Sequence, residues 1–140
     1  MGIKSIIAKP FAVGVAKQLR IHSLQAVLHQ EQILNNLLQQ AQHTSFGTEH
    51  RFKDLTNHAA YTAAVPIRDY EALKPYIEKV KSGEEDVLWK GKPVYFAKTS
   101  GTTSGVKYIP ISSVSIGEHI KAARNALLCY IAETGNTRFV

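Results

Sequence analysis

The clearest pattern of hydrophobic positions runs from Ser23 to His43, where apolar residues recur at spacings of three, four and seven. Such spacings place side chains on one face of an α-helix, and glutamine, asparagine and histidine fill the other face. Ser23 precedes the first apolar residue and suits an N-cap. The apolar positions are Leu24, Val27, Leu28, Leu34, Leu37, Leu38 and Ala41. We therefore predict one helix over residues 23–43 with this face in the core.

Residues 1–20 combine apolar positions with lysine and arginine, and no acidic residue occurs before Glu31. This pattern is typical of a basic amphipathic segment. Lysine and glycine interrupt it too often for a membrane span, and the layout of a signal peptide is absent. We expect it to pack against the parent domain and the protein to be cytoplasmic, with a surface-lying or targeting helix as the alternative.

The central region, residues 44–64, has no sustained hydrophobic period and predicts a long loop with short helical turns. Asp69 then suits an N-cap for a helix that runs to Val80 and ends at Ser82-Gly83. Pro75 falls inside this helix, where proline can separate or kink the first turn. The acidic residues that follow, Glu84, Glu85 and Asp86, predict a solvated turn.

Two short runs, residues 94–97 and 108–111, are rich in β-branched and aromatic residues and are bounded by turn formers. Runs of this length and composition predict β-strands joined by the residues between them. Trp89 lies just ahead of the first run. We expect it to be buried under the sheet rather than to stack on an adenine ring.

The C-terminal quarter predicts a helix over residues 116–133, because Ser115 and Glu118 have the spacing of a capping box. Residues 134–136 form its terminating turn, and residues 137–140 resemble the start of a strand. A two-stranded hairpin is marginal in water without further cover. We therefore predict an α/β fold in which residues 1–140 are the N-terminal portion of a larger, here incomplete, domain.

Composition narrows the function only slightly. The 140 residues allow one modest domain, and the net charge of +6 favours anionic partners. Lysine and arginine are scattered without a polybasic run, so we expect no nucleic-acid partner. Cys129 is the only cysteine and excludes an intramolecular disulfide, and we interpret it as a small hydrophobe rather than a nucleophile. The six histidines lack zinc-type spacing, so no metal site is predicted.

The candidate site is the segment between the two predicted strands, where hydroxyl residues and glycine occupy every position from Thr99 to Gly105. Glycines let backbone N–H groups converge on an anion, and hydroxyl groups add donors that rotate to suit phosphate oxygens. A lysine at the loop exit supplies a point charge. The glycine spacing does not meet the Walker pattern, and a polar loop without a ligand remains the alternative. The candidate binding residues are Thr99, Ser100, Gly101, Thr102, Thr103, Ser104, Gly105 and Lys107.

The same segment resembles the Ser/Thr/Gly-rich phosphate motif of the adenylate-forming superfamily. Its flanks, and motifs upstream, resemble the auxin-responsive promoter (Gretchen Hagen) family of acyl-acid amido synthetases in a bacterial-type form. The matching segments are Ala41-x-x-Thr44-x-Phe46-Gly47 with Phe52, Val65-Pro66-Ile67-Arg68-Asp69-Tyr70-Glu71, Leu73-Lys74-Pro75-Tyr76-Ile77, Tyr95-Phe96-Ala97-Lys98 and Lys107-Tyr108-Ile109-Pro110-Ile111.

The resemblance implies a two-step ligase reaction that uses ATP and Mg²⁺. A carboxylic acid is adenylated, and an amine, usually of an amino acid, then displaces AMP to form an amide. The phosphate loop is this chain's implied contribution. The adenine-binding residues, the metal-associated carboxylate and the mobile C-terminal domain would lie beyond Val140, so the chain alone is expected to be inactive. No catalytic residue is assigned.

Two other interpretations stay open. The chain could be a non-catalytic remnant that serves as a scaffold and binds nucleotide weakly at most. It could also be a basic module that binds nucleic acid or an acidic partner, which steeply salt-dependent binding would reveal.

Overall fold

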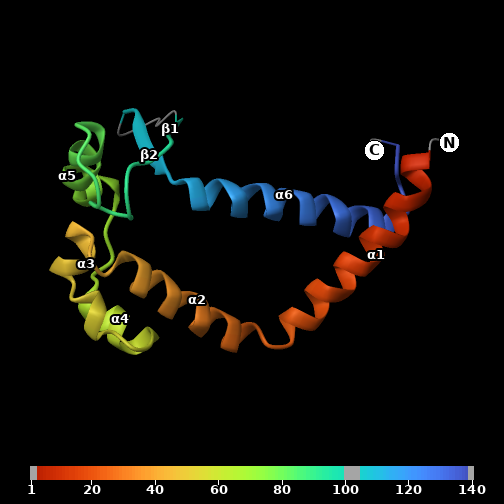
Figure 1. The fold of residues 1–140 in the computed structure, drawn as a ribbon, viewed down its shortest axis with the longest axis horizontal. Helices are drawn as coiled ribbons and strands as arrows, with labels where there is room; N and C mark the ends of the chain where they lie inside the picture. The colour runs from red at the N-terminus through yellow and green to blue at the C-terminus, as the bar shows by residue number, and fades with distance from the viewer. Residues whose placement is uncertain (1–2, 100–104, 139–140) are drawn as a thin grey trace. The chain divides into compact units, whose positions relative to one another are not determined.

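The computed structural model describes residues 3–99 and 105–138, and the side chains from Ile7 onwards. Their contacts form two compact units (Figure 1). The terminal unit comprises Met1–His29 and Val114–Val140, and the hairpin unit comprises Gln30–Ser113. The described elements are mostly helices with a small antiparallel sheet, in agreement with the predicted α/β class.

Two long helices make up most of the terminal unit: α1 (Ile3–Ser23) and α6 (Ser113–Thr134). Ala12 of α1 packs with Leu128 and Ile131 of α6 in a small buried cluster. An ion pair between Arg20 and Glu133 links the same two helices. The basic N-terminal segment therefore packs against another part of the chain. Within the described residues, no helix has the length and apolar character needed to cross a membrane.

The helix predicted to begin at Ser23 is divided differently. Ser23 is the last residue of α1, and its hydroxyl donates to the carbonyl oxygen of Arg20, so its prediction as an N-cap is wrong. A turn separates α1 from α2 (Ala26–Ala41) because the backbone N–H groups of Leu24 and Gln25 donate to carbonyls three residues earlier.

The apolar face predicted for this helix is buried only at its C-terminal end. Leu38 and Ala41 are buried, whereas Leu24, Val27 and Leu28 are more than half exposed. The expectation of a continuous core face is therefore wrong. Periodicity records which residues share a face, but burial depends on whether another segment covers that face.

Short helices build the core of the hairpin unit, as the central sequence predicted. They are α3 (Ser45–Glu49), the 3-10 helix η1 (Phe52–Asp54) and α4 (His58–Ala64), followed by α5 (Tyr70–Lys81). Leu38, Ala41 and Phe52 form the buried cluster, against which Phe46, Leu55, Tyr61 and Val65 pack. Side-chain oxygens of Thr44, Asn57 and Asp69 accept from the first-turn N–H groups of α3, α4 and α5.

The prediction for α5 is confirmed at both ends. Asp69 Oδ1 accepts from the backbone N–H of Ala72 at 2.9 Å, and Ser82 caps the C-terminus before Gly83 at φ +96°. Pro75 lies within one continuous helix rather than after a separate first turn. The solvated acidic turn is also confirmed, because residues 84–86 are exposed.

Trp89 occupies a different place from the one predicted. It is half-buried and packs against the Leu38, Ala41 and Phe52 cluster rather than under the sheet. The backbone N–H groups of Ser45 and Phe46 donate to the carbonyls of Asp86 and Val87, which brings this segment against the start of α3.

The sheet is an antiparallel hairpin of β1 (Tyr95–Thr99) and β2 (Lys107–Ile111). Its register pairs Tyr95 with Ile111 at one end and Thr99 with Lys107 at the other. Both predicted strands are therefore confirmed.

The C-terminal predictions are partly corrected. Helix α6 starts at Ser113, so Ser115 lies inside it rather than capping it, but its end at Thr134 before Gly135 agrees with the sequence. Thr137 and Arg138 are not in a strand, because the Arg138 N–H donates to the side chain of Asn136 in a local turn.

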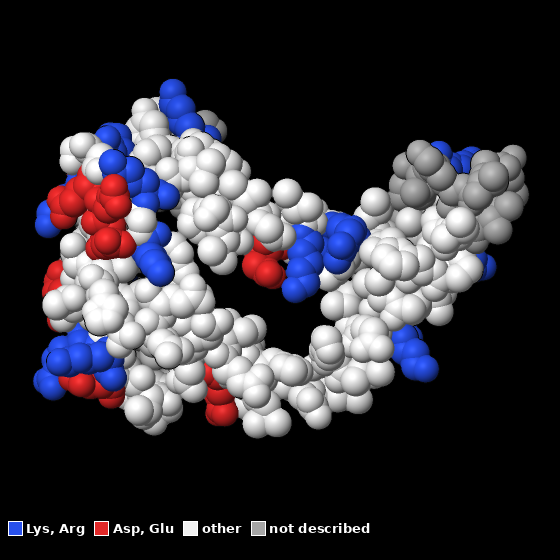
Figure 2. Space-filling model, viewed as in Figure 1, with Lys and Arg blue, Asp and Glu red and all other residues white. Residues whose placement is uncertain are grey.

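Charged residues of both signs alternate on the visible surface of the hairpin unit (Figure 2). Several are locally paired, such as Lys74 with Glu71, Lys81 with Glu78 and Lys92 with Glu85. This pairing fits the interpretation of the positive net charge as scattered surface charge.

Candidate functional site at the β-hairpin

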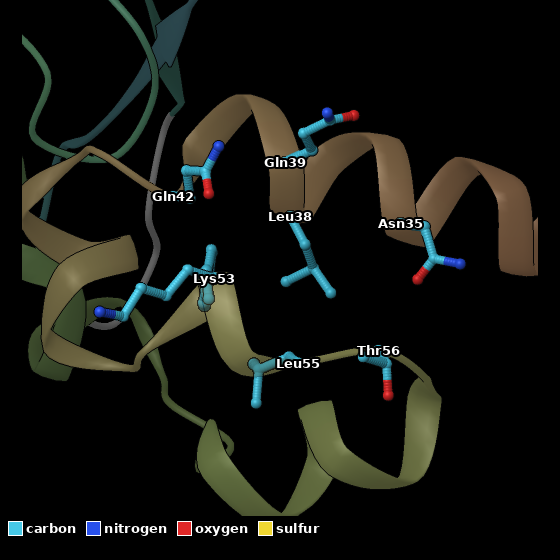
Figure 3. A pocket seen from close by; sticks show the side chains of 8 residues that line it. Asn35, Leu38, Gln39, Gln42, Lys53, Leu55 and Thr56 are labelled. Carbon is cyan, nitrogen blue, oxygen red and sulfur yellow. The ribbon is translucent and has the colours of Figure 1, made fainter.

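A cavity of about 330 Å³ lies beside the C-terminal half of α2 in the hairpin unit (Figure 3). Its polar lining consists mainly of neutral amide groups and includes no carboxylate. The lining residues are Asn35, Leu38, Gln39, Gln42, Phe52, Lys53, Leu55 and Thr56. Such a lining offers neither a general acid–base pair nor a phosphate cradle, so the cavity suggests no reaction.

Metal-binding and nucleophilic groups are equally sparse. Within residues 3–99 and 105–138, no three side chains of His, Cys, Asp or Glu are grouped closely enough to hold a metal ion. Cys129 is a half-buried thiol on α6. The candidate site is the hairpin, whose strands carry the two ends of the hydroxyl- and glycine-rich segment.

The hairpin brings the two ends of the candidate phosphate segment together. Thr99 ends β1 and Lys107 begins β2, and the two residues are direct cross-strand partners. Residues that face each other in an antiparallel pair extend their side chains from the same face of the sheet. The Thr99 hydroxyl and the Lys107 ammonium therefore belong to one face. Ser100, Gly101, Thr102, Thr103 and Ser104 lie outside the described residues.

Gly105 has a conformational reason to be glycine. Its φ of +77° lies in the left-handed region, which residues with a side chain rarely adopt. A Cβ atom at this position would meet no atom within 4 Å, so the restriction comes from the backbone and not from space. This conformation turns the chain into β2 two residues before Lys107.

Lys107 is half-buried and lies over an aromatic ring. Its Nζ is 5.6 Å from the ring centroid of Tyr70, which is within cation–π distance. Lys107 forms no ion pair with a carboxylate among the described residues. Its charge is therefore ordered by the fold without being neutralised by a carboxylate.

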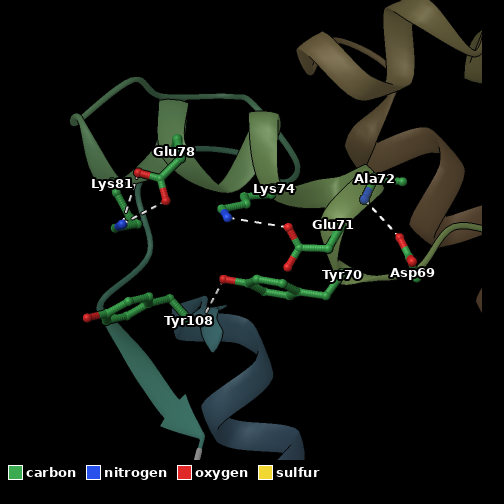
Figure 4. A network of polar contacts seen from close by, with 8 residues as sticks. All are labelled: Asp69, Tyr70, Glu71, Ala72, Lys74, Glu78, Lys81 and Tyr108. Carbon is green, nitrogen blue, oxygen red and sulfur yellow. Dashed lines mark hydrogen bonds and ion pairs between the residues drawn. The ribbon is translucent and has the colours of Figure 1, made fainter. Parts of the chain in front are cut away.

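Helix α5 holds the hairpin in place (Figure 4). The Tyr70 hydroxyl accepts from the backbone N–H of Tyr108 at 2.9 Å, and Lys81 Nζ lies 4.7 Å from the Tyr108 ring centroid. A hydrogen bond to Glu78 raises the pKa of Lys81, so this lysine stays protonated. Sequence reasoning missed Tyr70 and Lys81 as supports of the site. Their separation of eleven residues, three helical turns, indicated a shared face of α5 but not what that face contacts.

A second polar network joins α3 to α5 in the same unit. The Tyr76 hydroxyl donates to Glu49 Oε2 at 2.5 Å, and the Arg68 guanidinium lies 3.9 Å from the same carboxylate. Arg68 also lies over the Phe46 ring, at 5.3 Å from its centroid, and Phe46 meets Tyr76 edge to face. These contacts fix the angle at which α5 leaves the helical core, and thereby the position of the hairpin that α5 supports.

This network predicts a pH-dependent contribution to stability. The hydrogen bond to Glu49, followed by burial and the Glu49 charge, raises the pKa of Tyr76 above its usual 10.0. A raised pKa in the folded state stabilises the fold fully below pH 10, and this contribution is lost as the pH rises through the folded value. Tyr76→Phe removes the titrating group. We expect the urea midpoint of the unsubstituted chain to fall more between pH 8 and about pH 11 than that of Tyr76→Phe.

Tyr95→Phe is the matched control for this titration, because Tyr95 is a half-exposed tyrosine on β1. Its urea midpoint should follow that of the unsubstituted chain at both pH values. Equal losses of stability in the Tyr76→Phe and unsubstituted chains would contradict the assigned role of the Glu49 hydrogen bond.

Comparisons with known proteins agree with the resemblance in the sequence. A family model described as the GH3 family N-terminal domain matches residues 16–137. The indole-3-acetic acid-amido synthetase GH3.8 of Oryza sativa subsp. indica is 32% identical over 77 residues, which are 54% of this chain and 13% of that protein. The probable indole-3-acetic acid-amido synthetase GH3.11 of Oryza sativa subsp. japonica is 29% identical over 93 residues, or 66% of this chain and 16% of that protein.

A shorter match has a higher sequence identity. The probable indole-3-acetic acid-amido synthetase GH3.13 of Oryza sativa subsp. japonica is 43% identical over 47 residues, which are 34% of this chain and 10% of that protein. The chain thus spans between 10% and 16% of the length of these relatives. Because the family model covers most of the chain, the chain belongs to the GH3 family of acyl-acid amido synthetases, whose N-terminal domain it matches.

Proposed function

We propose that this chain is the N-terminal portion of an ATP-dependent acyl-acid amido synthetase and supplies its phosphate-binding loop. The observation that carries the proposal is the hairpin: a segment of hydroxyl and glycine residues connects two paired strands, and an uncompensated lysine stands at its exit. Membership of the GH3 family supports this role, since the relatives' names describe amido synthetases.

The proposed reaction has two steps. A carboxylate oxygen of the acid attacks the α-phosphorus of ATP, and pyrophosphate leaves with the electrons of the broken P–O bond. The nitrogen of an amino acid then attacks the acyl carbon, loses a proton and displaces AMP, so that an amide forms. Charge collects on the transferring phosphates in the first step, which makes positioned donors and cations the main catalytic contribution.

We assign the phosphates to residues 99–105 and Lys107. Backbone N–H groups at glycine, the hydroxyl groups and the Lys107 ammonium would each face a phosphate oxygen. The sequence from Lys98 to Tyr108 contains no carboxylate. Magnesium would therefore arrive with ATP and be held chiefly by phosphate oxygens, where it supplies charge neutralisation. The remaining nucleotide contacts and the amine site belong to the rest of the synthetase, and the cytoplasm is the compartment we propose.

The test is the exchange of labelled pyrophosphate into ATP by the longer polypeptide that carries this chain. We expect exchange that requires a carboxylic acid, measured over a panel of aryl and alkyl acids that includes indole-3-acetic acid. Addition of amino acids should then yield an amide that mass spectrometry identifies. The 140-residue chain alone should give no exchange.

Two results would contradict the proposal. A longer polypeptide that folds but gives no acid-dependent exchange with any member of the panel would favour the scaffold interpretation. Steeply salt-dependent binding of single-stranded or duplex nucleic acid, without exchange, would favour a basic binding module.

A further inference from the structure

The first residue of α5, Tyr70, reaches the hairpin in two ways. Its hydroxyl accepts the backbone N–H of Tyr108 at 2.9 Å, and its ring lies under the Lys107 ammonium. Figure 4 shows the Tyr70 hydroxyl directed at the backbone of β2, whereas the Tyr108 ring turns away towards Lys81. Tyr70 therefore holds both the backbone of β2 and the side chain of Lys107.

The alternation of side chains along β2 explains this arrangement. Lys107 and Tyr108 are consecutive, so their side chains leave opposite faces of the strand. Helix α5 contacts β2 and supplies a contact to each: Tyr70 to Lys107 and Lys81 to the Tyr108 ring. Between these two contacts, the Tyr70 hydroxyl takes the backbone N–H of Tyr108.

The ring contact restrains Lys107 without neutralising it. A carboxylate in the same place would order the lysine but would compete with an anionic ligand for its charge. An aromatic face attracts the ammonium through the ring quadrupole and leaves its N–H donors available. A lysine ordered in advance loses less conformational freedom when an anion binds, which strengthens binding.

We propose that Tyr70 is a positioning residue, which holds the Lys107 ammonium in place for a polyphosphate group before that group binds. This inference rests on the proposed function, because it takes the anion to be the pyrophosphate part of ATP. It adds a residue of α5, outside the hairpin, to the machinery of the phosphate site. Lys81 supports the same strand through the Tyr108 ring.

The first experiment measures the contact itself by NMR on the 140-residue chain. The Tyr70 ring should shift the Lys107 side-chain proton signals upfield through its ring current. Tyr70→Phe keeps the ring and should keep the shift, but it removes the hydroxyl and should speed hydrogen exchange at the Tyr108 amide. Tyr70→Leu should abolish the shift. Tyr95→Leu is the matched control, since it removes a half-exposed tyrosine at the opposite end of the hairpin and should leave the Lys107 signals unchanged.

The second experiment measures the consequence in the longer polypeptide through the KM for ATP in pyrophosphate exchange. We expect Tyr70→Leu to raise this KM about fivefold, with a smaller change in kcat, and Tyr70→Phe to raise it less. Lys107→Ala should raise it further. In the Lys107→Ala background, adding Tyr70→Leu should raise it no more than adding Tyr70→Phe, because only the hydroxyl contact to β2 is then left to lose.

The outcomes separate this inference from the proposed function. Lys107 signals that are the same in Tyr70→Leu as in the unsubstituted chain would overturn the positioning contact. The positioning role would also be overturned if Tyr70→Leu raised the KM for ATP equally in chains with and without the Lys107 side chain, because the substitution would then act on the fold as a whole. A Lys107→Ala variant with an unchanged KM would instead overturn the phosphate role of Lys107, even where the NMR shift persists.

Discussion

Replacing Ser100 and Thr102 together by alanine is expected to abolish acid-dependent pyrophosphate exchange in the longer polypeptide. The substitution removes two hydroxyl donors from the proposed phosphate site, where removal of a single well-placed donor costs an enzyme about a hundredfold or more in rate. The expected loss is therefore at least about a hundredfold in kcat/KM for ATP. Both positions lie outside the described residues, and the residues that flank the segment, Thr99 and Gly105, are exposed.

We expect folding to change little in this variant, and its urea midpoint checks this. Ser100→Thr with Thr102→Ser is the conservative control: it keeps a hydroxyl at each position and should keep most of the exchange. Ser113→Ala with Thr56→Ala removes two exposed hydroxyl groups elsewhere and should have no effect. Normal exchange by the double alanine variant would refute the assignment of the loop.

Gly47→Ala is expected to cause a large loss of stability in the hairpin unit. Gly47 is buried in α3, and a Cβ atom there would lie 2.0 Å from the carbonyl oxygen of Ala41 and 2.9 Å from its carbonyl carbon. These are backbone atoms at the end of α2, so no side-chain rotation can relieve the clash. Overpacking usually costs about 1–3 kcal/mol, and a backbone clash should reach the upper end of that range or exceed it.

The reason for so close an approach is the polar corner between α2 and α3. Thr44 is almost fully buried; its hydroxyl donates to the Ala41 carbonyl at 2.8 Å and accepts from the Gly47 N–H at 2.9 Å. Both bonds bring the Ala41 carbonyl and the Gly47 backbone against one side chain. An alanine at position 47 would force these groups apart and leave buried polar atoms without partners, which adds to the cost.

Urea denaturation followed by circular dichroism measures this effect. Gly117→Ala is the matched control, because Gly117 lies within helix α6 and a Cβ atom there would meet nothing within 4 Å. Alanine is favoured over glycine in a helix, so this variant should gain up to about 1 kcal/mol. A Gly47→Ala chain that unfolds at the same urea concentration as the unsubstituted chain would show that the corner is looser than described.

The sequence determined the features that depend on residues close together in the chain. Asp69 caps α5 as predicted, since an N-cap needs only its own side chain and an N–H three residues later. The two strands were predictable from short runs of β-branched and aromatic residues between turn formers. The family could also be identified from the sequence, because its motifs are short contiguous segments, one of which precedes Lys107.

Tertiary structure decided the features that depend on distant partners. The apolar residues of α2 are regular in sequence, yet Leu38 is buried and Val27 exposed, because only the C-terminal end meets Phe52 and its neighbours. Trp89 packs against that helical cluster and not the sheet. Tyr70 meets Lys107 because α5 packs on β2, 37 residues further along the chain. Capping and strand signals act over a few residues, whereas burial and ring contacts depend on which surfaces the folded chain brings together.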